Sequence, residues 1–304
     1  MMHRRLFVAR LGLGLGSLIA GGTVHAAQTV KVVTSFSLLG DMVRRIGGGM
    51  VSVQSLVPDD GDAHTYQPRP SDMRGVTGAA VLVENGLGFE GWMDRLTGAT
   101  RFAGARVVAT KGIKPRTMRQ GGGIVSVDPH AWQDPRNGVV YARNIQAGLI
   151  AAAPDHMHAL TDAADRYALA IAQADSWIEQ QFAGIPPERR RVITTHDAFG
   201  YYGDRYGIEF LAAQGINTDA EPSARAVAGL IAQIRKENIG AVFIENMTDG
   251  RMAKMLARET GAVVGGTVYS DALSPPNGPA ASYLAMLRHN TTLFARAMRG
   301  GKLG

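Results

Sequence analysis

Residues 154–187 have the sequence PDHMHALTDAADRYALAIAQADSWIEQQFAGIPP. Apolar side chains recur in it every three or four positions, at Leu160, Ala164, Tyr167, Ile171, Ala174, Ile178 and Phe182. This spacing predicts an amphipathic helix, which Gly184 and the Pro186-Pro187 pair bring to an end. At about 1.5 Å per residue, the ~28 residues of this helix span about 42 Å, which is longer than one small domain needs. We therefore expect a rigid helix that connects two domains.

On both sides of this helix, short runs of β-branched residues alternate with helical patterns. Before the helix, we expect strands at Val30–Thr34, Val51–Val57, Ala80–Glu84, Arg106–Ala109 and Ile124–Val127. After it, we expect strands at Val192–Thr195, Ile208–Ala213, Ala241–Glu245 and Val263–Val268. Strand–helix alternation with nearly continuous apolar strands is typical of a parallel sheet that is covered on both faces. The sequence therefore predicts an α/β protein of two lobes, each with a parallel sheet flanked by helices, joined by the long helix.

These patterns divide the chain into four parts. We expect an export segment at 1–27, an N-terminal α/β lobe at 28–153, the linking helix at 154–185 and a C-terminal α/β lobe at 186–304. The chain of 304 residues, 45% hydrophobic and 19% charged, is long and apolar enough for two globular domains. The sequence contains no cysteine, which excludes disulfides, thiolate metal ligands, a cysteine nucleophile and a lipid-modified cysteine within it.

The export segment has the features of a secretory signal peptide. A basic start is followed by an apolar stretch over residues 11–20, and small residues predict cleavage near Ala26 or Ala27. The pair Arg4-Arg5 also resembles a twin-arginine motif, so the general secretory route and the twin-arginine route both stay open.

Charge and hydropathy limit the partners of the mature chain. Cleavage after Ala26 would remove three arginines and no acidic residue, which lowers the formal net charge from +6 to +3. That charge on ~280 residues is no footprint for nucleic acid. Outside the export segment, no stretch of about 18 uncharged apolar residues predicts a membrane span. We expect a protein that is exported to the periplasm and binds no nucleic acid.

Three histidines and one aspartate each lie just after a predicted strand, two of them in each half of the chain. They are His64, His130, His196 and Asp271. Parallel sheets place ligands at the carboxyl ends of their strands, so the four would converge if the lobes face each other. One histidine at such a position is more often a hydrogen-bonding loop residue, but four together favour a metal site between the lobes. Three neutral imidazoles and one carboxylate suit a divalent ion, zinc above all.

Other functions fit the sequence less well. Residues 86–91 match the G-x-G-x-x-G phosphate loop, but the acid that a dinucleotide fold needs about 20 residues later is missing. An exported zinc hydrolase would keep one coordination position open and set a general base beside the bound water. Here four protein ligands would close the coordination, and Asp197 or Glu245 would have to act as the base without a recognisable motif. An adhesin with a purely structural metal would fail to complement a metal-import deletion.

Several motifs carry a family resemblance, and they occur in the family's order. They are Asp62–Pro68 (DAHTYQP), Asn85–Trp92 (NGLGFEGW), Asp128–Pro135 (DPHAWQDP), His196–Tyr201 (HDAFGY), Tyr206-Gly207, Glu221–Ser223 (EPS) and Tyr269–Leu273 (YSDAL). With these motifs the chain resembles the solute-binding proteins of zinc- and manganese-importing ABC transporters, from about Val30 to its C-terminus.

The resemblance implies a receptor rather than an enzyme. The implied protein is a monomer that binds one divalent metal ion, with zinc as first choice and manganese as second, and delivers it to a membrane permease. By resemblance, His64, His130, His196 and Asp271 hold the ion. Manganese-favouring relatives often have glutamate at the position of His196, so His196 favours zinc. The long helix implies that the lobes open only slightly when the metal leaves.

The chain departs from the family pattern at three places. Ala63 stands where the family usually has proline, which loosens the loop that presents His64. The segment Lys111–Gly123 contains no histidine, whereas many zinc receptors have a histidine-rich loop there. No cysteine is available for lipidation, so the chain resembles free periplasmic receptors rather than tethered ones.

Polar groups near the four candidate ligands could orient the imidazoles through their second ring nitrogens. Asp134, Asn137 and Asp197 are the candidates, and helix capping is the alternative role for each. Because imidazole ligands must be neutral, we expect metal-dependent stability to fade below about pH 6.

Overall fold

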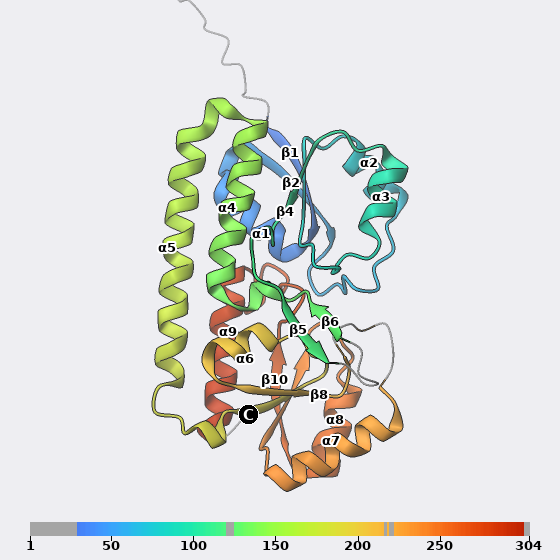
Figure 1. Ribbon diagram of the computed structural model, residues 1–304, viewed down its shortest axis with the longest axis vertical. Coiled ribbons are helices and arrows are strands. Elements are labelled where there is room, and N and C mark those ends of the chain that lie inside the picture. Colours follow the sequence, from blue (N-terminus) through green and yellow to red (C-terminus); the bar gives the residue numbers. More distant parts are fainter. Residues whose placement is uncertain (1–28, 120–124, 216–217, 219–221, 301–304) are drawn as a thin grey trace, which may run out of the picture.

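The computed structural model describes residues 29–119, 125–215, 218 and 222–300. The predicted export segment, residues 1–27, lies outside the described residues. Two four-stranded sheets form the centres of two lobes, one above the other in Figure 1. The prediction of a two-lobed α/β fold is confirmed.

The N-terminal lobe is built around a parallel sheet of order β2-β1-β3-β4. Its strands are β1 (Val30–Phe36), β2 (Val51–Val57), β3 (Val81–Glu84) and β4 (Ala105–Val108). Its helices are α1 (Ser37–Gly47), α2 (Pro70–Thr77), α3 (Met93–Thr100) and α4 (Pro135–Ala152). Figure 1 shows α1 and α4 on one side of the sheet and α2 and α3 on the other, which explains why β3 is buried along its whole length.

The C-terminal lobe has a second parallel sheet, of order β10-β9-β7-β8. Its strands are β7 (Arg191–Thr194), β8 (Glu209–Ala212), β9 (Ala241–Glu245) and β10 (Val263–Val268). Its helices are α6 (Gly200–Tyr206), α7 (Ala224–Glu237), α8 (Arg251–Thr260) and α9 (Tyr283–Met298). In each sheet, strands that are not consecutive in the sequence lie side by side: β1 pairs with β3, and β7 pairs with β9.

The long helix α5 (Met157–Phe182) runs beside both lobes. It packs against α4 and α1 of the N-terminal lobe and against α9 of the C-terminal lobe. Every residue of the predicted apolar stripe, from Leu160 to Phe182, is buried. A short 3-10 turn at Pro154–His156 separates α4 from α5 and reverses the chain direction.

One predicted strand belongs to a different sheet from the one we expected. The sequence suggested that Ile124–Val127 continues the parallel sheet, and Ile124 itself lies outside the described residues. The observed strand β6 (Val125–Asp128) instead pairs antiparallel with β5 (Arg116–Arg119) in a two-stranded ribbon. Val125 and Val127 are 60% and 41% exposed, as one open face of a two-stranded ribbon allows. The β5 segment lacks an apolar run, so hydrophobicity did not predict it.

The ribbon and several loops cross from one lobe to the other. In Figure 1 the β5–β6 ribbon lies against the C-terminal lobe, where the Tyr201 hydroxyl accepts a hydrogen bond from the backbone of Arg116. Ser37 Oγ accepts from the backbone N–H of Leu273 at 3.0 Å, and Asp41 accepts from that of Tyr283 at 2.9 Å. No helix within the described ranges is long and apolar enough to cross a membrane.

We expect Ile171→Ala in α5 to lower the free energy of unfolding by about 2–5 kcal/mol, because the Ile171 side chain is fully buried and its loss leaves a cavity. Leu169→Ala on the same helix is the matched control, since Leu169 is 60% exposed and its truncation should change stability by less than about 0.5 kcal/mol. Urea unfolding followed by circular dichroism measures both. Equal effects would contradict the assignment of the buried face.

Candidate metal centre

Hydrogen bonds from backbone N–H groups to carboxylates hold the three predicted histidines of the site in their loops. The backbone N–H of His64 donates to Asp62 Oδ1 at 2.9 Å, in the loop that follows β2. The backbone N–H of His130, after β6, donates to Asp128 Oδ1 at 3.0 Å, and that of His196, after β7, donates to Glu245 Oε1 at 2.9 Å. In each loop a carboxylate therefore fixes the backbone of the histidine that follows or faces it.

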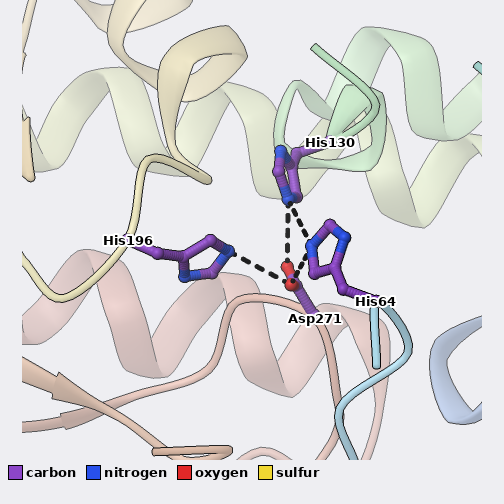
Figure 2. A group of neighbouring side chains, drawn as sticks. All are labelled: His64, His130, His196 and Asp271. Atoms are coloured by element: carbon purple, nitrogen blue, oxygen red, sulfur yellow. Dashed lines mark hydrogen bonds and ion pairs between the residues drawn. The ribbon is translucent and has the colours of Figure 1, made fainter. Parts of the chain in front are cut away.

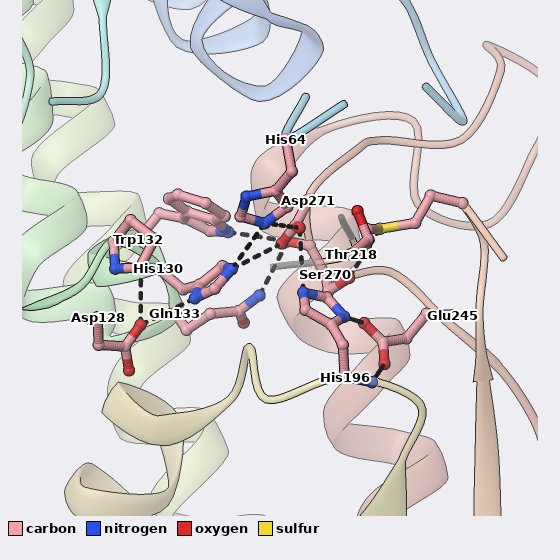
Figure 3. A network of polar contacts seen from close by, with 12 residues as sticks. His64, Asp128, His130, Trp132, Gln133, His196, Thr218, Glu245, Ser270 and Asp271 are labelled. Atoms are coloured by element: carbon pink, nitrogen blue, oxygen red, sulfur yellow. Dashed lines mark hydrogen bonds and ion pairs between the residues drawn. The ribbon is translucent and has the colours of Figure 1, made fainter. Parts of the chain in front are cut away.

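The loop of Asp271 is held from the opposite half of the chain. The Ser270 carbonyl, next to Asp271, accepts hydrogen bonds from Trp132 Nε1 and Gln133 Nε2, each at 2.9 Å. Both donors lie immediately after His130 in a short 3-10 turn, and all three side chains are buried. These two hydrogen bonds therefore connect the loop of His130 to the loop of Asp271 (Figure 3).

The four side chains meet at one point, as Figure 2 shows. One ligand atom from each lies within 4.8 Å of all the others. Asp271 Oδ2 is 3.1 Å from His64 Nε2 and 3.2 Å from His196 Nε2, whereas Oδ1 is 3.6 Å from His130 Nε2. The Nε2 atoms of His64 and His130 are 3.3 Å apart. Ligand atoms about 2.1 Å from a tetrahedral zinc ion are roughly 3.4 Å from each other, so these distances suit a bound ion.

The outward nitrogens of two imidazoles contact buried carboxylates. His130 Nδ1 lies 2.8 Å from Asp128 Oδ1, and His196 Nδ1 lies 2.5 Å from Glu245 Oε2 (Figure 3). Such contacts fix the ring orientation, leave Nε2 directed at the centre and raise its basicity. Asp128 and Glu245 therefore act as the orienting groups for these two imidazoles.

In this cluster, burial and the neighbouring charges shift the pKa values in opposite directions, and the charges together outweigh burial. Burial alone would lower the pKa of His130, but attraction to Asp271 and the hydrogen bond with Asp128 raise it to about 9. Burial likewise opposes the charged form of His196, yet Glu245 and Asp271 raise its pKa. Burial would raise the pKa of Asp271, but His196 and His130 hold it well below its usual range. Without a metal, the carboxylate is thus compensated by protons on the imidazoles.

Some buried polar atoms of the cluster lack an aligned hydrogen bond. Among the described residues these include both ring nitrogens of His196, Glu245 Oε2 and Asp271 Oδ1. Buried polar atoms rarely stay unsatisfied. The inward-facing atoms, His196 Nε2 and Asp271 Oδ1, lie where a cation would bind them both, so the donor set fits a divalent metal ion.

Aromatic rings surround the imidazoles on the N-terminal side. The ring centroid of Phe89 lies 4.8 Å from that of His64, and the centroid of Trp132 lies 5.3 Å from that of His130. Phe89 belongs to the glycine-rich segment at residues 86–91, whose Glu90 carboxylate accepts from Ser35 Oγ and from the backbone of Asn85. This segment therefore forms a wall of the site, and its glycines serve a turn instead of a phosphate.

The three polar residues that we considered as orienting groups are placed differently. Asp134 caps α4 by accepting from the backbone of Arg136, and Asn137 donates to the Ala131 carbonyl at 3.0 Å. The Asp134 bond corresponds to the capping alternative, whereas Asn137 bonds a carbonyl of the turn that precedes α4. Asp197 is half-buried next to His196, and its pKa is raised first by desolvation and then by repulsion from Asp128. Among the hydrogen bonds of the described residues, the imidazole contacts belong to Asp128 and Glu245 instead.

Glu245, one of the two residues that a hydrolase could use as a base, is already engaged in other contacts. Glu245 Oε1 accepts from the backbone of Thr195, from Thr195 Oγ1 and from the backbone of His196, and its other oxygen faces His196 Nδ1. Glu245 is fully buried on the far side of the imidazole from the cluster centre. No observation at this site favours a hydrolase.

Sequence reasoning missed the roles of Asp128 and Glu245 for different reasons. Asp128 is two residues before His130, and an Asp-Pro-His run predicts a side chain that turns back onto the following backbone. Glu245 is far from His196 in the sequence, and only the pairing of β7 with β9 brings them together. The sequence near Asp128 thus contains a local signal for its role, whereas no local signal indicates the role of Glu245.

The chain is similar to several known metal-binding proteins. The manganese-binding lipoprotein MntA of Halalkalibacterium halodurans is 29% identical over 96% of this chain and 96% of its own length. The iron-binding protein YfeA of Yersinia pestis is 31% identical over 93% of this chain and 91% of its own. The solved periplasmic zinc binding protein TroA of Treponema pallidum superposes with a TM-score of 0.84 at 26% identity, covering 89% of this chain and 99% of that one.

The family described as zinc-uptake complex component A, periplasmic, matches residues 32–297, which include both lobes, the linking helix and all four residues of the cluster. The chain belongs to this family.

Proposed function

We propose that this chain is the solute-binding protein of an ABC importer, which captures one divalent metal ion and delivers it to a membrane permease. The convergence of His64, His130, His196 and Asp271 from both lobes, with ligand atoms within 4.8 Å of one another, is the observation that carries the proposal. Relatives named as metal-binding lipoproteins and periplasmic binding proteins support it. We further propose export to the periplasm through residues 1–27, and action as a monomer.

The donor set favours zinc as the ion and manganese as second choice. Three imidazoles and one carboxylate form a nitrogen-rich site, whereas manganese prefers oxygen ligands and binds more weakly at almost any shared set. The names of the relatives include manganese, iron and zinc and so do not choose among them. His196 is the residue on which the choice depends, because it supplies the third imidazole.

Metal capture in this site exchanges protons for a cation. In the metal-free protein, the raised pKa values of His130 and His196 keep positive charge beside the Asp271 carboxylate. A divalent ion provides the same compensation once the imidazoles lose their protons. The site can thus stay folded in both states, which a receptor that loads and unloads requires.

Competition titration tests the assignment of the metal. Wild type should bind zinc more tightly than manganese, and His196→Glu should narrow the difference by weakening zinc more. Asp271→Ala should weaken both ions, by about tenfold or more, because it removes the charged ligand. His158→Gln is a matched control, since His158 is exposed on α5 and is not one of the four residues of the cluster.

If His196→Glu leaves the zinc-to-manganese ratio of affinities unchanged, His196 does not bind the ion and the four-ligand site is wrong. If wild type binds neither ion, the proposed function itself is wrong.

We expect the affinity for zinc to rise from about pH 6 to about pH 9, with about one to two protons released per ion bound near neutral pH. In the metal-free protein the raised imidazole pKa values stabilise the fold at low pH, and this contribution is lost as pH rises through about 9. A ligand at 1,000 times its dissociation constant stabilises the fold by about 4 kcal/mol. At a fixed zinc concentration, this stabilisation should grow over the same pH range, because the dissociation constant falls.

Calorimetry in buffers of different ionisation enthalpy counts the released protons, and melting curves with zinc or chelator follow the stability. Histidines with ordinary pKa values would lose metal-dependent stability only below about pH 6. The raised pKa values of His130 and His196 move this loss to higher pH. Binding without proton release would contradict the charge assignment.

The radius of gyration should be nearly the same with and without metal. The helix α5 packs on helices of both lobes, and buried hydrogen bonds such as Ser37 to Leu273 join them. Such connections allow small local shifts rather than a wide hinge swing. Small-angle X-ray scattering in zinc and in chelator makes the comparison, and a marked compaction on loading would overturn the rigid-helix interpretation.

A further inference from the structure

An ion-pair network lies behind His130, on the side away from the cluster, and reaches from the buried Asp128 to the largely exposed Asp204. Arg116, on β5, donates from Nη1 to Asp128 Oδ2 at 3.1 Å and from Nε to Asp204 Oδ2 at 2.8 Å. Asp128 uses its other oxygen for His130, at both the backbone N–H and Nδ1. The guanidinium therefore contacts the carboxylate that orients a candidate metal ligand.

The network also reaches the loop of His196. Asp204 lies on α6, which begins a few residues after His196. Tyr201 of the same helix accepts a hydrogen bond from the Arg116 backbone at 2.8 Å and donates to the Asp128 carbonyl at 3.3 Å. Gly200, at the start of α6, passes so close that an added Cβ would overlap Arg116 Nη1 and lie 2.7 Å from Asp128 Oδ2.

Arg116 also contributes to charge compensation in the metal-loaded site. The carboxylates of Asp128, Glu245 and Asp271 are all fully buried around the imidazoles. A divalent ion would offset two of these three negative charges, and the Arg116 guanidinium, which it shares with the exposed Asp204, places further positive charge at hydrogen-bond distance from Asp128. Positive charge beside a buried carboxylate reduces the large cost of an uncompensated ion.

We propose that Arg116 is a positioning residue for metal binding. It fixes Asp128 behind His130 and joins the β5–β6 ribbon to α6. In this way it holds the imidazoles of His130 and His196 at the separation that lets both bind one metal ion. This inference rests on the proposed function. It predicts that Arg116 acts on the bound metal through Asp128 without touching the metal itself. A planar guanidinium can bond both carboxylates at fixed angles, which a lysine ammonium does less well.

The test uses cobalt(II) as a zinc substitute with an absorption spectrum that reports ligand geometry, together with the rate of zinc loss to a chelator. Arg116→Gln should speed zinc loss about tenfold and change the cobalt spectrum, as losses of such supporting contacts do. Arg116→Lys should recover part of both, and Gly200→Ala should shift both in the direction of Arg116→Gln by displacing the guanidinium. Arg143→Gln is the control, because Arg143 of α4 forms a surface ion pair with Asp165 of α5.

A double-mutant cycle shows whether Arg116 works through Asp128. In an Asp128→Asn background, Arg116→Gln should change the rate of zinc loss less than twofold, because the contact it supports is already gone. Additive effects of the two changes would overturn the proposed route.

The remaining outcomes also decide the matter. If Arg116→Gln loses zinc within twofold of the wild-type rate with an unchanged cobalt spectrum, the inference is wrong while the proposed function stands. A lower melting temperature of the metal-free Arg116→Gln protein, with wild-type zinc loss and spectrum, would assign Arg116 a merely structural role and also overturn the inference. Failure of wild type to bind cobalt or zinc overturns both.

Discussion

The buried carboxylate of Asp271 is the group on which the site depends. It has no exposed surface, and its oxygens face imidazoles that come from both lobes. An ionised carboxylate in such a place is strongly unfavourable unless a positive charge lies beside it. Protons on His130 and His196 supply that charge in the metal-free protein, and a divalent ion would supply it in the loaded one. The three histidine loops must therefore approach Asp271 in both states.

The rest of the fold holds these loops against one another. The helix α5 packs on both lobes, and the Trp132 and Gln133 side chains bond the carbonyl that precedes Asp271. Because these contacts are buried, they lose little to competition with water. A site whose ligands are held before the ion arrives spends little free energy on ordering them, which raises affinity.

Surrounding groups set the electronic character of the imidazoles. Asp128 and Glu245 contact the outward nitrogens of His130 and His196, while the ring of Phe89 lies against His64. The carboxylates increase the electron density at Nε2, and the apolar ring lowers the local dielectric constant. The charged groups that tune the site therefore come from β6 and β9, elements that also shape the two lobes.

Local sequence patterns predicted the α/β class, the stripe from Leu160 to Phe182 and the four residues of the cluster, because hydrophobic periodicity and short motifs are local properties. They did not predict that β6 pairs with β5 outside both parallel sheets, or that Glu245 lies behind His196. Tertiary structure decided both, and also that Asp134 caps a helix while Asp128 orients His130. Strand order and contacts between distant loops depend on which surfaces pack together, and no local pattern of residues encodes that packing.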